Sequence, residues 1–428
     1  MSRRLSIKSV SFLWLGSFAG AGLAFLSQVL LARLLNPELF GLFGAGLALA
    51  MLLTPIASFG IGQYWLKAFG EEGWHGVRWV RPSIKLVIFS TAVAMAMLLM
   101  WAILGPNTTA GQTLLIFLSF HIAGQVAIEL VSSKLQLEER FGVLALWQFS
   151  PHLLRFLLIL ATVFIVSSFN SFWVGWVYGI TAATVVLFAV FFIKQMTTHR
   201  FLLRGHPAVQ DGSAQEKVGV VDVAKQAWPF GLAVLAYLIY FQSDLALVKY
   251  MVGDAEAGFY NVAFTIMTAV YLFPSVLFQK FFLPKIHRWA HQDREKLRQV
   301  YLAGNKWMLV IGIAVAVVLA ALAEPVVHLL FGETYIVSAN YVKIFCLSIP
   351  AMFLAFCSGA MLVTKEHMKV KVRFMLWVAG FNIGLNIILI PIYGALAAAL
   401  TTVASQYLLA VLYHYGASQR VFSEKWKQ

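Results

Sequence analysis

The stretch Asn36-Pro37-Glu38-Leu39-Phe40-Gly41-Leu42-Phe43 has a second copy, Gly253-Asp254-Ala255-Glu256-Ala257-Gly258-Phe259-Tyr260, which begins 217 residues further along the chain. Each copy follows one long apolar segment and precedes another. A repeat separated by half the chain indicates two copies of one structural unit. In membrane proteins such paired units usually enclose a substrate path, so we expect the functional residues where the two halves face each other.

The composition is that of a membrane protein. Of the 428 residues, 61% are hydrophobic and 12% are charged, and the mean hydropathy is +0.80; soluble domains carry roughly 25% charged residues. Apolar runs of about 20 residues, enough for a helix to cross ~30 Å of hydrocarbon, recur along the chain. The predicted fold class is an all-α polytopic membrane protein with twelve transmembrane helices, near residues 10–32, 41–66, 84–104, 110–133, 143–167, 172–193, 228–249, 258–283, 307–331, 339–362, 373–391 and 395–416.

The net charge of +14 is distributed in a way that indicates membrane topology. Of the 32 Lys and Arg residues, 28 fall at the termini and in every second loop, whereas Arg33 and Lys249 stand at the opposite ends of segments. Basic loops stay in the cytoplasm, so both termini are predicted to be cytoplasmic, as an even number of spans requires. Topology therefore explains the charge, and no nucleic acid is expected as a partner.

The chain is predicted to contain two lobes of six helices each. Residues 1–193 form the N-terminal lobe, and residues 228–428 form the C-terminal lobe with a short cytoplasmic tail. Residues 194–227 contain the longest polar stretch and are expected to be a cytoplasmic linker. Segment 284–306 mixes basic and apolar residues, which predicts an amphipathic helix on the cytoplasmic face, near the headgroups of membrane lipids.

A second repeat supports the first. Residues 135–143 align with residues 362–370, at an offset of 227. In each half, the stretch joins the fourth predicted helix to the fifth on the predicted cytoplasmic side. The same offset carries Arg155 onto Asn382, so each half has a polar residue at one equivalent place in its fifth helix.

Several stretches in both halves carry a family resemblance: LARLLNPELFGLF at 31–43, DLALV at 244–248 with AGFYNVA at 257–263, LFGETY at 330–335, and NIILIPIYGALAAA at 386–399. They are similar to bacterial polysaccharide flippases, the translocases of O-antigen (lipopolysaccharide) and exopolysaccharide units. These flippases belong to the multidrug/oligosaccharidyl-lipid/polysaccharide exporter superfamily. The resemblance covers both lobes at the expected spacings.

The resemblance implies two six-helix bundles in a V that work by alternating access in the bacterial cytoplasmic (inner) membrane. The implied substrate is a polyprenyl-pyrophosphate-linked oligosaccharide, flipped from the cytoplasmic to the outer leaflet. Polysaccharide polymerase and chain-length machinery are the expected protein partners. The alternative within the superfamily is a cation-coupled drug antiporter. The sequence shows no catalytic constellation, metal-spaced ligand set or cofactor motif, so we do not expect an enzyme.

Arg155 is the main substrate-binding candidate. It falls at the midpoint of the predicted span 143–167, from which its side chain cannot reach either interface. A charge at mid-bilayer costs about 2.5–3.5 kcal/mol, so it needs a partner or a water-filled cavity. We expect its guanidinium to bind the pyrophosphate or acidic sugars of the substrate, two oxygens at once. The alternative is a structural pair with backbone carbonyls or a neighbouring carboxylate.

Four further side chains complete the candidate cavity set. Arg33 and Lys343 stand near the outer ends of their spans, where they either line the mouth of the cavity or only extend to the interface. His121 and His152 fall at mid-depth of the fourth and fifth spans. Each histidine either bonds substrate or handles a proton, or it is a structural histidine satisfied by a carbonyl.

The second half has a candidate cation site. Asp244, Asn386 and Thr402 each lie about 8–10 Å below the outer end of their span at 1.5 Å per residue, and Asn382 is one turn below Asn386. Four oxygen-bearing side chains with one anion suit a hard cation, so coupling to Na⁺ or H⁺ is a hypothesis. Two alternatives remain open: hydrogen bonding between helices, worth about 0.6 kcal/mol, and an ion pair of Asp244 with Lys249.

Overall fold

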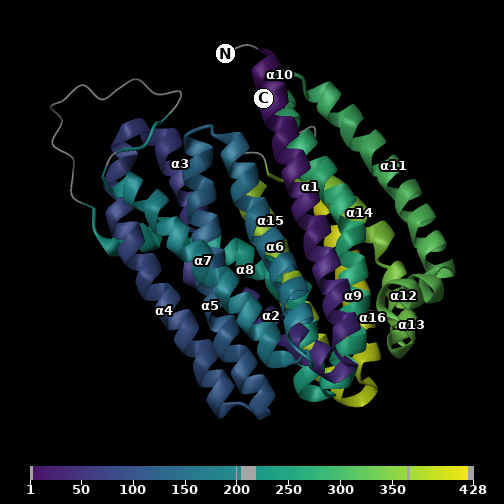
Figure 1. The fold of residues 1–428 in the computed structure, drawn as a ribbon. Helices are drawn as coiled ribbons and strands as arrows, with labels where there is room; N and C mark the ends of the chain where they lie inside the picture. Colours follow the sequence, from purple (N-terminus) through teal and green to yellow (C-terminus); the bar gives the residue numbers. More distant parts are fainter. Residues whose placement is uncertain (1–2, 199, 204–217, 364–366, 423–428) are drawn as a thin grey trace. The chain divides into compact units, whose positions relative to one another are not determined.

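The computed structural model describes residues 3–198, 200–203, 218–363 and 367–422, and no strand occurs within these ranges. Fifteen residues of the predicted linker, at 199 and 204–217, and the end of the predicted tail, at 423–428, lie outside the described residues. The α-helices, in chain order, are α1 (Arg3–Leu34), α2 (Pro37–Ser58), α3 (Ile61–Glu72), α4 (Val80–Leu104), α5 (Thr109–Leu137), α6 (Phe141–Ile165), α7 (Ser171–Thr197), α8 (Val220–Met251), α9 (Asp254–Ser275), α10 (Leu283–Gln292), α11 (Arg294–Ala321), α12 (Ala323–Phe331), α13 (Ser338–Cys346), α14 (Ile349–Met361), α15 (Met368–Tyr393) and α16 (Ala395–Gly416) (Figure 1).

The all-helical, multi-pass character predicted from composition is confirmed. Among the described residues, ten helical stretches are long and apolar enough to cross a membrane, or eleven when the bent pair α13 and α14 counts as one span. One of the ten, Pro37–Leu104, has 68 residues. A straight helix of that length would be about 100 Å long, roughly three times the hydrocarbon thickness. It contains α2 and α4, which correspond to two of the predicted spans. The number twelve and the cytoplasmic side of the termini stay predictions.

Three predicted spans are interrupted, each beside glycine or proline. The segment 41–66 breaks between α2 and α3, where Phe59 and Gly60 have φ of 53° and 70°, a conformation that ends a right-handed helix. The segment 307–331 breaks at Leu322, three residues before Pro325. The segment 339–362 bends by 49° between α13 and α14, beside Pro350 in the first turn of α14. Apolar composition alone did not indicate these breaks.

The chain divides into two compact units whose boundaries fall inside helices. The first unit comprises Met1–Leu34 and Gly46–Leu235, and the second comprises Leu35–Ala45 and Ala236–Gln428. The first turns of α2 therefore group with the second unit, and the first half of α8 groups with the first. A division by sequence alone could not anticipate this exchange, because both helices are continuous apolar segments.

The two units repeat one packing pattern. In the first unit α4 packs on α5, and α7 packs on both α5 and α6. In the second unit α11 packs on α14, and α16 packs on both α14 and α15. In the order of the predicted spans, the third, fourth, fifth and sixth helices of each half therefore make equivalent contacts, as the internal repeat predicts.

The two copies of the first repeat cross each other within the second unit. A Cβ atom added to Gly41 would lie 1.9 Å from the carbonyl oxygen of Asp254 and 2.5 Å from the amide nitrogen of Gly258. A Cβ atom added to Gly258 would lie 2.0 Å from the carbonyl oxygen of Pro37. The repeated glycine thus lets the first turns of α2 and α9 touch backbone to backbone.

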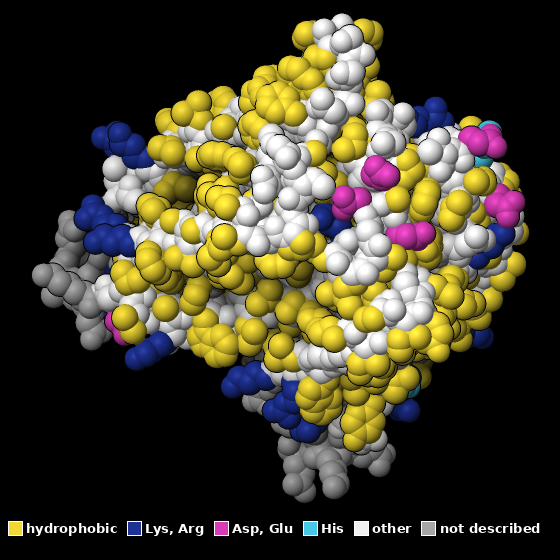
Figure 2. Space-filling view, turned by 90° about the horizontal axis from the view of Figure 1, so that it is seen from below, with side chains coloured by type: hydrophobic (Ala, Val, Ile, Leu, Met, Phe, Trp, Pro, Cys, Tyr) yellow, Lys and Arg dark blue, Asp and Glu magenta, His cyan; other side chains and the backbone are white. Residues whose placement is uncertain are grey.

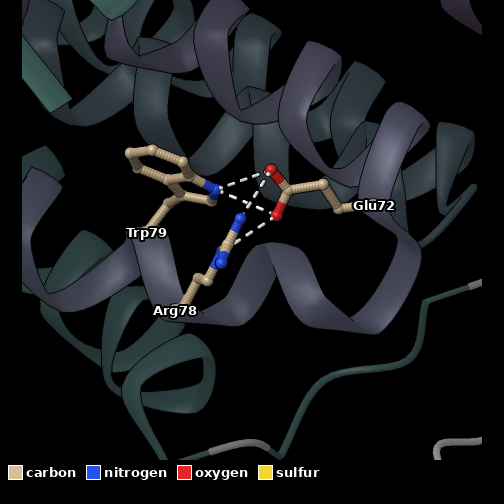
Figure 3. Close-up of polar contacts among 3 residues, drawn as sticks. All are labelled: Glu72, Arg78 and Trp79. Carbon is tan, nitrogen blue, oxygen red and sulfur yellow. Dashed lines mark hydrogen bonds and ion pairs between the residues drawn. The ribbon is translucent and has the colours of Figure 1, made fainter. Parts of the chain in front are cut away.

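The turn between α3 and α4 is held by one carboxylate. Glu72, the last residue of α3, accepts hydrogen bonds from Arg78 Nε at 3.1 Å and Nη2 at 3.2 Å, and from Trp79 Nε1 at 3.0 and 3.1 Å (Figure 3). The 3₁₀ segment Gly73–Trp79 connects the three residues. A bidentate carboxylate–guanidinium pair is geometrically specific, so it sets the direction in which α4 leaves the turn.

The surface has the apolar character of a protein surrounded by lipid. Large hydrophobic side chains such as Ile88, Phe164 and Leu187 are exposed on the spans, which in a bilayer needs no polar partner. Figure 2 shows one face on which hydrophobic side chains cover most of the area and charged ones form a few small groups. Segment 284–306 is helical as α10 and the start of α11, and on α10 Ile286 and Trp289 are buried while Arg288 is exposed.

Candidate functional site

In the first unit Arg155 is buried near the middle of α6. Its side chain is 7% exposed, and its Cζ lies 4.1 Å from the centre of the Tyr178 ring on α7. His121 on α5 meets the same ring edge-on, with ring centres 5.4 Å apart. A cation over an aromatic face is attracted by about 2 kcal/mol or more when both are desolvated. Tyr178 therefore joins the predicted residues Arg155 and His121 in one cluster.

The remaining neighbours of Arg155 are polar but not acidic. His121 and His152 lie close enough to interact electrostatically with the guanidinium. Gln125 Nε2 lies 3.1 Å from His121 Nε2, one turn further along α5. Within the described part of the chain no carboxylate forms an ion pair with Arg155. The alternative of a structural pair with a neighbouring carboxylate is therefore wrong for the described residues.

The cluster retains hydrogen-bonding capacity. Two of its buried atoms, Arg155 Nε and His152 Nδ1, have no hydrogen-bond partner among the described residues. A buried N–H without a partner costs about 1–3 kcal/mol. Such groups in native structures indicate water or a ligand that satisfies them. The arrangement can therefore bind an anion by charge and by directed N–H donors.

The other two cavity candidates do not join this cluster. Arg33 is exposed in the last turn of α1. Lys343 on α13 is also exposed, and its Nζ lies 2.6 Å from Glu324 Oε1 at the start of α12. Lys343 therefore has a local partner on the surface of its own unit.

The second unit brings all four candidate cation-site residues together. Asp244 is 2% exposed, and its carboxylate accepts hydrogen bonds from three side chains. Asn386 Nδ2 donates to Oδ1 at 2.6 Å, Tyr260 OH donates to Oδ2 at 3.2 Å, and Thr402 Oγ1 donates to Oδ2 as well. The Asn382 side chain lies beside the same carboxylate. Because these partners come from three helices, Asp244 ties α8, on which it lies, to α9, α15 and α16.

Two tight connections place these side chains at one depth. Asp244 precedes the turn at Val252 and Gly253 between α8 and α9, and Tyr260 follows it. Asn386 precedes the turn at Gly394 between α15 and α16, and Thr402 follows it. Each residue is about two helical turns, roughly 10 Å, from its connection. The hairpin geometry therefore sets the level of the site, as the sequence spacing predicted.

A further layer of polar groups surrounds the carboxylate. Asn382 Oδ1 accepts hydrogen bonds from Asn386 Nδ2 at 3.2 Å and from Ser243 Oγ at 3.5 Å. Asn382 Nδ2 donates to Ser405 Oγ at 3.3 Å. Asn386 Oδ1 is buried and has no partner among the described residues. One carboxylate with hydroxyl and amide oxygens is the donor set that hard cations prefer, and the unpartnered Asn386 oxygen fits a cation.

The two clusters occupy equivalent places in the repeat. The offset of 227 that relates Arg155 to Asn382 also relates Tyr178 to Ser405. In each unit the two equivalent residues touch: the guanidinium lies over the Tyr178 ring, and the Asn382 amide donates to Ser405. At this place the first unit has the Arg155 guanidinium, whereas the second unit has neutral polar groups beside the Asp244 carboxylate.

Sequence reasoning missed two tyrosines and one ion pair. Tyr178 and Tyr260 are central to their clusters, and Tyr260 belongs to the repeat that defines the fold, a signal that could have identified it. Lys249 Nζ lies 3.4 Å from Asp254 Oδ1. The expected alternative of a pair between Lys249 and Asp244 is therefore wrong, because the basic side chain points to the residue after the turn.

A family model described as "Polysaccharide biosynthesis protein" matches residues 6–289, more than half of the chain. An uncharacterised membrane protein in the cps region of Klebsiella pneumoniae is 22% identical over 382 residues, which are 87% of this chain and 74% of that protein. An uncharacterised membrane protein of Methanocaldococcus jannaschii is 26% identical over 184 residues, 42% of this chain. This match covers only 34% of the archaeal protein's length.

Solved transporters share the fold. The lipid II flippase MurJ in an inward closed conformation superimposes with a TM-score of 0.73 at 15% identity, covering 95% of this chain and 87% of that one. A multidrug resistance MATE family transporter of the MOP superfamily, in an inward-facing conformation, gives a TM-score of 0.71 at 14% identity, with 94% of each chain covered. At these identities the likeness establishes the architecture alone.

Proposed function

This chain belongs to the polysaccharide biosynthesis protein family, and from that premise we propose that it moves polyprenyl-pyrophosphate-linked oligosaccharides from the cytoplasmic to the outer leaflet. It is a multi-pass membrane protein with the fold of MOP-superfamily transporters. In our proposal it works by alternating access in the bacterial inner membrane and passes its product to a polysaccharide polymerase with its chain-length machinery.

The observation that carries this proposal is Arg155. A guanidinium near the middle of a membrane span, without a carboxylate, is costly to maintain and is therefore a functional candidate by default. Its face lies against the Tyr178 ring, so the N–H donors at its edge are the groups that would bind phosphate oxygens. His121 and His152 add donors for the same anion. A pyrophosphate linkage is the part of the substrate that this cluster would recognise.

Arg155→Ala is expected to block export and Arg155→Lys to retain part of it. Loss of charge-assisted hydrogen bonds of about 1.5–3 kcal/mol lowers substrate affinity roughly ten- to a hundred-fold. The measurement is surface polysaccharide, together with lipid-linked units on the cytoplasmic leaflet, in cells that depend on this gene. Arg140→Ala removes a guanidinium that is exposed and lies outside the cluster, so it is the matched control, with export near wild type.

Normal export by the Arg155→Ala variant, at equal protein level, would falsify the role of this side chain. A different result would favour the alternative within the superfamily, a cation-coupled drug antiporter. If the wild-type chain made a drug-sensitive host resistant to cationic drugs and left polysaccharide export unchanged, the drug-antiporter hypothesis would replace this one.

We further propose that Asp244 is the coupling site for a cation, Na⁺ or H⁺, that travels as a second substrate. Burial of a lone carboxylate in a membrane protein is expensive unless its charge is balanced. The described residues around Asp244 supply hydroxyl and amide groups and no cationic partner. Binding of a cation would balance the charge and draw the ends of α8, α9, α15 and α16 together.

Asp244→Asn is expected to abolish the response to the coupling cation. In detergent, wild-type protein should unfold at a higher temperature as Na⁺ replaces choline at constant ionic strength, because a ligand that binds only the folded state stabilises it. The Asp244→Asn variant should show no such shift. Equal transport by wild type and variant, with and without a sodium or proton gradient, would contradict coupling at this site.

A further inference from the structure

Gln406 is a buried amide that the site described above does not use. It lies in α16, one turn after Thr402, and its side chain is 1% exposed. Neither Nε2 nor Oε1 has a hydrogen-bond partner among the described residues. Both the donor and the acceptor of this side chain are thus unpaired inside the second unit.

A wholly unpaired amide is costly at this position. Moving such a group from water into an apolar environment without a hydrogen bond is unfavourable. The bilayer supplies no water to compensate. Buried polar groups in native proteins are therefore satisfied, and an exception indicates an ordered water or ion. A role for Gln406 as hydrogen-bonding glue between helices would require a protein partner, and none occurs in the described part of the chain.

The helix geometry directs Gln406 toward the Asp244 cluster. Residues four apart lie on the same face of a helix, and side chains lean toward its N-terminus. The N-terminus of α16 is the end at which Thr402 donates to Asp244. Asn386, which donates to the same carboxylate, also has a buried oxygen, Oδ1, without a partner among the described residues. Gln406 therefore lies on the face of α16 that carries Thr402, one turn from the residue that donates to the carboxylate.

We propose that Gln406 holds water of the cation's hydration shell and so completes the Asp244 site. Its Oε1 accepts a hydrogen bond from a water that binds the cation, and its Nε2 donates to a second water. The cation is then bound partly hydrated, with Asp244 and Thr402 on one side and water on the other. This inference rests on the cation coupling proposed at Asp244 and adds a residue that sets affinity and selectivity.

The test is a titration of thermal stability in Gln406→Leu. The purified full chain in detergent is unfolded at increasing Na⁺ with choline as the replacing ion, and the titration is repeated with Li⁺. Outer partners of a metal typically contribute ten- to a hundred-fold in affinity, so half-maximal stabilisation should need about ten-fold more Na⁺. Without Na⁺ the variant should unfold no earlier than wild type, because an unpaired polar group has been removed.

Two comparisons make the result decisive. Thr181→Val removes a buried hydroxyl of α7 that donates to Val177 O at 2.7 Å, and it should leave the Na⁺ response unchanged. Gln406→Glu keeps an acceptor oxygen and should retain more of the response than Gln406→Leu. A wild-type response in Gln406→Leu, while Asp244→Asn has none, overturns the role of Gln406 and leaves the coupling site standing. If wild type itself responds to neither Na⁺ nor Li⁺, the role of Gln406 and sodium coupling both fail, and proton coupling at Asp244 is decided by transport of wild type and Asp244→Asn under a proton gradient.

Discussion

Replacing Glu138 by alanine is expected to lower the free energy of unfolding by about 3–5 kcal/mol, because it leaves a buried lysine without its partner. Lys134 Nζ lies 2.7 Å from Glu138 Oε1, and the two side chains are 0% and 4% exposed. The pair closes the end of α5, one turn apart along the helix. The Lys134 ammonium also lies 5.5 Å from the centre of the Phe192 ring, which cannot neutralise its charge.

The measurement is the midpoint of thermal unfolding in detergent, followed by tryptophan fluorescence. The double variant Lys134→Met with Glu138→Gln removes both charges and should recover most of the loss, since an apolar replacement of a buried pair is often neutral or stabilising. Arg140→Ala is the matched control, because its guanidinium is exposed and lies 3.6 Å from the same carboxylate. Unchanged stability in Glu138→Ala would show that Lys134 does not depend on this partner.

Gly258→Ala is expected to disrupt the crossing of α2 and α9. The added methyl group would lie 2.0 Å from Pro37 O and 2.8 Å from Pro37 C, and backbone atoms cannot rotate away as a side chain does. Overpacking of a close contact costs about 1–3 kcal/mol, and here the whole start of one helix must shift. Gly41→Ala should behave alike, because its added methyl group would meet Asp254 O.

Folded yield and unfolding temperature report the effect of these substitutions. Gly384→Ala is the control: an alanine Cβ there meets nothing within 4 Å. In an exposed helix interior, alanine is favoured over glycine by about 1 kcal/mol, so this variant should be as stable as wild type or more so. Wild-type stability in both Gly258→Ala and Gly41→Ala would mean that the two helices do not touch at their glycines.

The spacing of polar residues from the short connections predicted the depth of the candidate cation site in the membrane. Asp244, Asn386 and Thr402 lie at similar distances from short connections, and helix rise converts those distances into one depth. The structure adds that their side chains point to a common centre, together with Asn382. Depth follows from residue counting, whereas the direction of a side chain depends on how each helix is rotated against its neighbours.

Arg155 illustrates what residue counting leaves open. Its mid-span position was evident from the chain, but its neighbour was not. The ring that covers it belongs to Tyr178, which is 23 residues away in sequence and on another helix. An aromatic residue in an apolar segment gives no local signal that distinguishes packing from a cation contact. Tyr178 is distinguished from other aromatic residues only by its position in the repeat, where it is equivalent to Ser405.

The chain itself determined its helical class, its lipid-exposed surface and its duplication, because apolar length and repeat spacing are properties of the sequence. Tertiary structure decided which residues touch. The repeated glycines Gly41 and Gly258, separated by 217 residues, lie backbone to backbone, and the pair Lys134 and Glu138 excludes solvent. The physical reason is that the length of an apolar run specifies which segments can cross the membrane. Contacts between side chains depend instead on helix rotation and on close approach, which no single segment encodes.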